Sequence, residues 1–138
     1  MISTKDLIFA GGLIHFSILS ASVCVPFVLD WKSALSSLRP FLRRLFWIYG
    51  VFIILVIVGF GVVSVRNAAF LAAGGPLARD FCALVAVFWA FRLFIQCFVF
   101  DIRELNFPRW VRTGYHMLTA AFVTMTAIYG AAALRLYF

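Results

Sequence analysis

The sequence predicts an all-α integral membrane protein, a four-transmembrane-helix bundle, and two observations carry that prediction. The chain has 138 residues, of which 65% are hydrophobic and only 12% are charged, whereas soluble chains average about 45–50% apolar and about 25% charged residues. The apolar residues form four runs with almost no charge, each close to the ~20 helical residues that cross a bilayer core. These runs are residues 7–29, 45–65, 81–100 and 115–134. We expect residues 1–138 to form a single membrane domain.

The first run could be mistaken for a signal peptide, because Lys5 precedes it and the small residues Ser-Ala-Ser occupy positions 20–22. Its apolar stretch continues through Leu29, beyond the roughly 7–15 residues of a signal h-region. We therefore expect a retained helix. The other three runs are also expected to be helices, because a spanning segment must satisfy its backbone polar groups internally.

The Lys and Arg residues of the loops predict an orientation. Loops 30–44 and 101–114 share one side of the membrane and carry seven Lys and Arg residues, whereas the other side carries four. The positive-inside rule places the basic loops in the cytoplasm and both termini on the non-cytoplasmic side. The segments 42–61 and 88–101 are typical of a small bacterial membrane protein, so the expected location is the inner membrane of a bacterium, as a multi-pass protein.

Two shorter patterns predict local structure. The segment 66–80 contains an apolar half followed by Gly-Gly-Pro, which predicts a short helix and a turn lying on the membrane. The hexapeptide FVLDWK at 27–32 resembles FVFDIR at 98–103. Each closes an odd-numbered span and opens a basic loop, so the chain could consist of two pseudo-repeated helical hairpins.

Arg92 is the most informative residue, because it lies inside the third run and no acidic residue lies within any of the four runs. Gln96 is one turn away on the same face, and Trp89 could offer Arg92 a ring face. Depth counting places several polar side chains at the level that Arg92 can reach. The hypothetical ligand-binding set is Arg92, Gln96, Tyr49, Tyr115, His116 and Thr119. The alternative is an arginine that is hydrogen-bonded only to Gln96, backbone carbonyls and water.

Two histidines raise the question of a haem. His15 lies in the outer half of the first run and His116 near the inner end of the fourth, so their depths differ by well over 10 Å. A haem held by both rings needs them at one depth, which argues against it. His15 stays a weak candidate axial ligand with some other partner. We expect no cofactor and no metal.

The residues predict a binding or structural function more strongly than catalysis. The sequence contains no G-x-S-x-G motif, no H-E-x-x-H motif and no paired carboxylates. The net charge is +7, and the charged residues lie between the apolar runs, where they suit anionic lipid headgroups better than nucleic acid. The first hypothesis is an accessory or scaffold subunit of a membrane assembly, with a membrane-protein partner or a homo-oligomer. The alternative is binding or transport of an anionic amphiphile, a lipid, quinone or isoprenoid, through a cytoplasm-facing polar pocket around Arg92. An enzyme, redox or haem protein ranks third.

Overall fold

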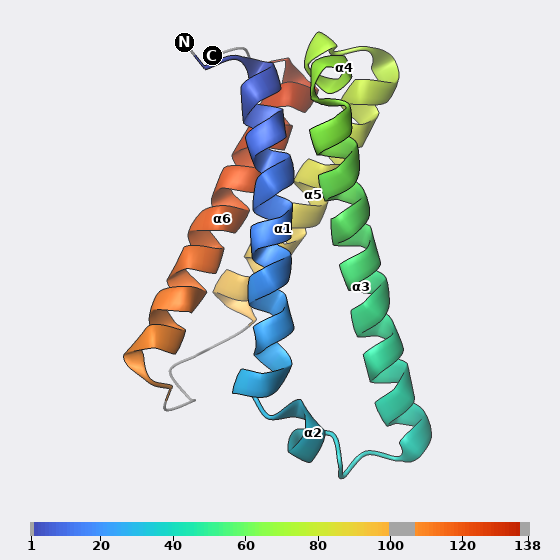
Figure 1. Ribbon diagram of the computed structural model, residues 1–138, viewed down its shortest axis with the longest axis vertical. Helices are drawn as coiled ribbons and strands as arrows, with labels where there is room; N and C mark the ends of the chain where they lie inside the picture. The colour runs from blue at the N-terminus through green and yellow to red at the C-terminus, as the bar shows by residue number, and fades with distance from the viewer. Residues whose placement is uncertain (1, 100–106, 136–138) are drawn as a thin grey trace.

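The computed structural model describes residues 2–99 and 107–135, which form helices joined by short turns, with no strand among them (Figure 1). In chain order the helices are α1 (Thr4–Val28), α2 (Trp31–Ala34), α3 (Pro40–Arg66), α4 (Ala68–Ala73), α5 (Pro76–Phe98) and α6 (Arg109–Leu134). Within these residues, α1, α3, α5 and α6 are long and apolar enough to cross a membrane. The prediction of a multi-pass four-helix bundle is therefore confirmed.

Each long helix begins three to six residues before the apolar run that predicted it. At α1 a capping box explains the early start, because Asp6 N donates to Ser3 Oγ at 3.2 Å and Ser3 N donates to Asp6 Oδ2 at 3.1 Å. Pro40 and Pro76 open α3 and α5, at the position where a missing N–H costs nothing. Residue 100, the predicted end of the third run, and most of the FVFDIR hexapeptide lie outside the described residues.

The long helices form two hairpins, one of α1 with α3 and the other of α5 with α6. The hairpins meet through contacts of α1 with α6 and of α4 with α1 and α5. The two ends of the chain lie together at one end of the molecule, beside α4, and α2 lies at the opposite end (Figure 1). Whether the hairpins derive from a repeat remains a prediction.

The segment between the hairpins contains the short helix and turn that its sequence predicted. Helix α4 ends at Gly74, which adopts the left-handed conformation at φ 75°. A Cβ at this position would also lie 2.9 Å from Nε of Arg135, so the backbone favours glycine and a side chain here would displace the Arg135 guanidinium. Gly75 and Pro76 then start α5.

Glycines allow α1 and α3 to approach closely in the half of the molecule that holds the termini. A Cβ on Gly12 would lie 2.7 Å from Val65 Cγ2 and 3.0 Å from the Val65 backbone nitrogen. A Cβ on Gly61 would lie 3.1 Å from Cβ of His15. Because lipid tails are as apolar as the side chains, membrane helices associate through close packing of this kind.

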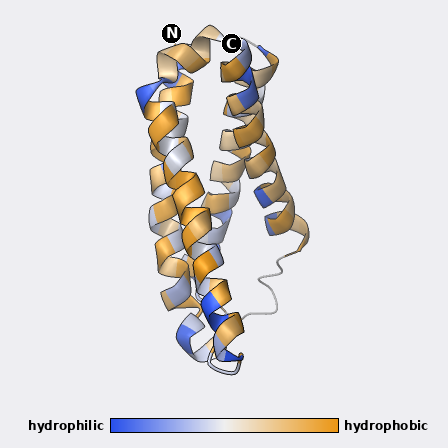
Figure 2. Cartoon of the chain, turned by 90° about the vertical axis from the view of Figure 1, so that its right-hand side faces the viewer, coloured by the Kyte–Doolittle hydropathy of each residue, from blue (hydrophilic) through white to orange (hydrophobic). Residues whose placement is uncertain are grey.

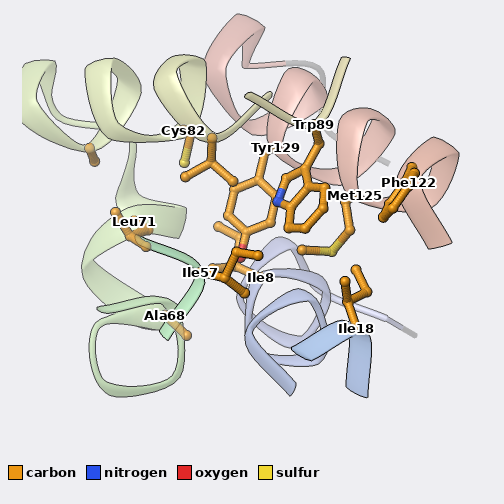
Figure 3. Packing of buried hydrophobic residues seen from close by; sticks show 12 residues of the cluster. Ile8, Ile18, Ile57, Ala68, Leu71, Cys82, Trp89, Phe122, Met125 and Tyr129 are labelled. Atoms are coloured by element: carbon orange, nitrogen blue, oxygen red, sulfur yellow. The ribbon is translucent and has the colours of Figure 1, made fainter. Parts of the chain in front are cut away.

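The buried hydrophobic core contains residues of all four long helices and of α4, packed around Trp89 and Tyr129 (Figure 3). In α1 the buried residues end at Ile18, and in α3 they begin only at Ile57. Residues 41–56 of α3 include no buried residue. The hairpins therefore pack at the termini end and diverge toward the end that carries α2 (Figure 1). The helices are hydrophobic along most of their length, and hydrophilic residues lie mainly toward their ends (Figure 2).

Candidate functional site

Arg92 lies on the core-facing side of α5 although its side chain is exposed. It follows Trp89 by three residues and precedes Gln96 by four, a spacing that places all three on one helical face. Trp89 and Gln96 are 1% and 3% exposed. The side of α5 that carries Arg92 is thus the packed side, and Arg92 lies one turn beyond Trp89, near the last buried residues of α1 and α3, Ile18 and Ile57. Arg92 therefore borders the region where the hairpins diverge.

Gln96 joins α5 to α6 through a set of hydrogen bonds. Its Nε2 donates to Thr119 Oγ1 at 2.7 Å and to the Tyr115 carbonyl at 3.1 Å. The Tyr115 hydroxyl donates to the Gln96 carbonyl, and Thr119 Oγ1 donates to the Tyr115 carbonyl at 3.0 Å. Three of the predicted site residues are thus brought together. Their polar groups mainly satisfy one another, so they hold the α5–α6 hairpin in place beside Arg92.

An aromatic ring from α6 offers its face to Arg92. The guanidinium carbon lies 5.7 Å from the centroid of the Phe122 ring, within the roughly 6 Å of a cation–π contact. Trp89 stacks on Phe122 with centroids 5.2 Å apart and an interplanar angle of 26°. Phe122 thus lies in contact with both residues, and the contact of Arg92 with Phe122 crosses the hairpin.

Two predicted site residues lie apart from this group. Tyr49 is 59% exposed and belongs to the half of α3 that diverges from α6 (Figure 1). His116 is exposed, with its ring edge-on to Tyr115 at a centroid distance of 5.6 Å. The structure therefore groups Gln96, Tyr115 and Thr119 beside Arg92, with His116 at the margin and Tyr49 on the far hairpin.

Sequence reasoning missed a buried polar cluster in the termini half that involves all four long helices. Trp89 Nε1 donates to His15 Nε2 at 3.0 Å, and the other ring nitrogen of His15 lies 2.8 Å from the Gly11 carbonyl. The Tyr129 hydroxyl donates to Ser64 Oγ at 2.6 Å, and the Tyr129 ring is 5.7 Å from that of His15. Because an indole nitrogen only donates, His15 is the neutral tautomer with its proton on Nδ1.

This cluster bears on the haem question. Both ring nitrogens of His15 are engaged by protein atoms, so axial ligation by His15 would require one of these bonds to break. His15 contacts Tyr129, which lies about 20 Å along α6 from His116. Within residues 2–99 and 107–135, no three His, Cys, Asp or Glu side chains are grouped as metal ligands would be. The sequence feature that could have indicated this cluster is Gly11, one turn before His15. Gly11 leaves room for the Tyr129 ring.

Comparison with known proteins adds no function to this geometry. No protein-family model matches the chain, and no curated protein and no solved structure matches it. The functional argument therefore depends on the arrangement of the side chains alone.

The Gln96 cluster makes a first testable prediction. Gln96→Leu removes the side-chain bonds to α6 while keeping a similar volume, and membrane interhelical hydrogen bonds contribute about 0.6 kcal/mol on average and at most about 1.7 kcal/mol. We expect the free energy of unfolding to fall by about 1 kcal/mol, measured by detergent-induced unfolding in mixed micelles. Cys97→Leu, at the exposed neighbouring position, should leave it unchanged. An equal loss in both variants would contradict a bonding role for Gln96.

Proposed function

We propose that the chain binds an anionic amphiphile between its two hairpins, with Arg92 as the charged contact. The observation that carries this proposal is the exposure of Arg92 on the packed side of α5, near the point where the buried residues of α3 end at Ile57 and the stretch 41–56 without a buried residue begins. In a bilayer the exposed apolar surface of residues 41–56 of α3 must be covered by lipid-like or protein groups. An occupant with an apolar body and one negative charge matches a region with apolar walls and one cation.

The chemistry of the residues supports separate roles for them. A guanidinium meets a phosphate or carboxylate with two parallel hydrogen bonds. Arg92 lies about 9 Å from the end of α5, within reach of a group that enters from that end of the membrane. Gln96, Tyr115 and Thr119 keep the α5–α6 hairpin closed behind it. The apolar surface of α3 suits the tail of a lipid, quinone or isoprenoid.

The orientation and the membrane are part of the same proposal. The basic residues of α2, of the start of α3 and of the start of α6 lie at the end of the molecule away from the termini. The positive-inside rule then supports a cytoplasm-facing site, with the termini on the non-cytoplasmic side of a bacterial inner membrane.

A second candidate function is an accessory or scaffold subunit, and one observation favours it. Residues 41–56 of α3 are unburied, and nothing lies within 4 Å of a Cβ placed on Gly50 or Gly59. Small residues on an open surface permit another helix to approach closely. In this alternative a partner helix, or a second copy of the chain, occupies the space between the hairpins. An Asp or Glu of that partner protein would face Arg92.

Substitution of Arg92 tests both functions. Arg92→Leu should fold, because an apolar side chain costs less than a charge inside a membrane span. It should bind short-chain phosphatidylglycerol about tenfold more weakly than the wild type, the loss of one charge-assisted contact, while Arg92→Lys recovers part of the affinity. Binding is measured by native mass spectrometry after gentle purification, with Arg112→Leu as the control.

The outcomes separate the two candidates. A retained lipid whose amount falls in Arg92→Leu supports the amphiphile. A stoichiometric protein partner or a dimer that is lost in Arg92→Leu supports the subunit. If neither depends on Arg92, both functions are wrong, and the arginine only interacts with its own chain.

A further inference from the structure

We infer that the termini end of the molecule carries a second binding site, for a phosphate-bearing headgroup or a free phosphate, in a hollow between α4, α5 and α6. The hollow has a volume of about 700 Å³, within the size range of small-molecule sites. Its charged lining residues are Arg79 and Arg135 together with Asp80, and Gly74 and Gly75 line it at the turn. This end is opposite to the region around Arg92, so the two sites are independent.

Each of the two arginines is held by a hydrogen bond to the backbone of another helix, Arg79 to α6 and Arg135 to α4. Arg79 Nε donates to the Ala133 carbonyl near the end of α6 at 3.1 Å, and an Arg135 terminal nitrogen donates to the Ala73 carbonyl at the end of α4 at 3.3 Å. Carbonyls at helix C-termini favour cations. Each bond uses one of the five N–H donors of a guanidinium, so both groups are oriented while donors are left for a ligand.

Glycine makes room for one of these guanidiniums. A Cβ on Gly74 would lie 2.9 Å from both Nε and a terminal nitrogen of Arg135. The guanidinium therefore lies directly against the turn that joins α4 to α5, at the edge of the hollow. A larger residue at position 74 would displace Arg135 from the lining.

The charge and the depth of the hollow indicate the ligand. Two guanidiniums against one carboxylate give the lining a net charge of +1, which favours an anion. The lining residues lie where α5 begins and α6 ends, so they lie at the ends of two candidate spans, which is the level of lipid headgroups. Phosphate oxygens are the acceptors that a pair of arginines recognises most readily.

The experiment measures binding of two probes to the full chain carrying Arg92→Leu, in neutral detergent, so that the site proposed around Arg92 does not contribute to the signal. The probes are short-chain phosphatidylglycerol, with phosphatidylcholine of the same chain length for comparison, and inorganic phosphate. We expect Arg79→Gln and Arg135→Gln each to weaken phosphatidylglycerol binding about tenfold, and Asp80→Asn to strengthen it by removing a like charge. Arg66→Gln removes an exposed arginine from the same end without touching the hollow, and should have a much smaller effect.

The results distinguish the source of the anion. If inorganic phosphate competes with the lipid and its binding depends on the same arginines, the ligand is a free phosphate. If inorganic phosphate does not compete, the ligand is the lipid headgroup. Circular dichroism and a melting curve show whether each variant folds. If an arginine variant does not fold, the affinity of Asp80→Asn still tests the site. The site is refuted if Asp80→Asn leaves the affinity unchanged. It is also refuted if folded Arg79→Gln or Arg135→Gln loses no more affinity than Arg66→Gln.

Discussion

Trp89→Ala is expected to lower the free energy of unfolding of the bundle by about 3 kcal/mol, the range of large-to-small substitutions in a packed core. Trp89 is 1% exposed, stacks on Phe122 and donates its indole N–H to His15. Its loss therefore removes contacts that α5 makes with both α6 and α1. Equilibrium unfolding in mixed micelles measures the change. Phe91→Ala, two residues away and 68% exposed, should stay within about 0.5 kcal/mol of the wild type.

The Phe substitution at the same position separates packing from hydrogen bonding. Trp89→Phe keeps a ring against Phe122 but leaves His15 Nε2 without its donor, which should cost about 1 kcal/mol. A loss for Trp89→Phe as large as that for Trp89→Ala would mean that the bond to His15, and not the stacking, holds the helices together. A loss no larger than that of Phe91→Ala would contradict the central position of Trp89.

The span positions could be predicted because lipid imposes a simple rule on composition. A run of about 20 apolar residues has few alternatives in a bilayer, so all four long helices were predicted. Their early starts were missed at Pro40 and Pro76, because an apolar run measures the depth of the membrane and not the length of the helix. The short helix α4 could be predicted from the Gly-Gly-Pro break that ends it.

The association of Gln96 with Thr119 and Tyr115 was partly predictable, because depth counting correctly places residues of adjacent antiparallel helices at one level. The same counting failed for Tyr49. Depth says nothing about lateral distance, and α3 is apolar on nearly every face between residues 45 and 63. Such a helix has no sequence signal for which side packs, so its divergence from α6 could be found only in the structure.

The partners of Arg92 and His15 show a second limit of sequence reasoning. Trp89 is at the right spacing to cover Arg92, but a helix carries several residues on each face, and the choice among them depends on the helix opposite. In the structure Trp89 donates a hydrogen bond to His15, and the Phe122 ring lies under the Arg92 guanidinium. Neighbours within one helix follow from spacing, whereas contacts between helices depend on packing geometry that no spacing encodes.

Gly12→Leu is expected to separate α1 from α3 and to lower the free energy of unfolding by about 3 kcal/mol, the upper part of the range for overpacking. A Cβ at Gly12 already lies 3.0 Å from a backbone atom of Val65, and a backbone atom cannot move aside as a flexible side chain can. The larger side chain must therefore push the helices apart and loosen the contact around Gly61 and His15. Detergent-induced unfolding, followed by circular dichroism, measures the change in the free energy of unfolding.

Gly59→Leu is the matched control, because nothing lies within 4 Å of a Cβ at that position, only two residues from Gly61 on the same helix. It should change the free energy of unfolding by less than about 0.5 kcal/mol. If Gly12→Leu is as stable as Gly59→Leu, the close approach of α1 and α3 does not stabilise the bundle. If instead Gly59→Leu alone is destabilising in the assembled protein, another helix lies against that open face of α3, as the accessory-subunit function requires.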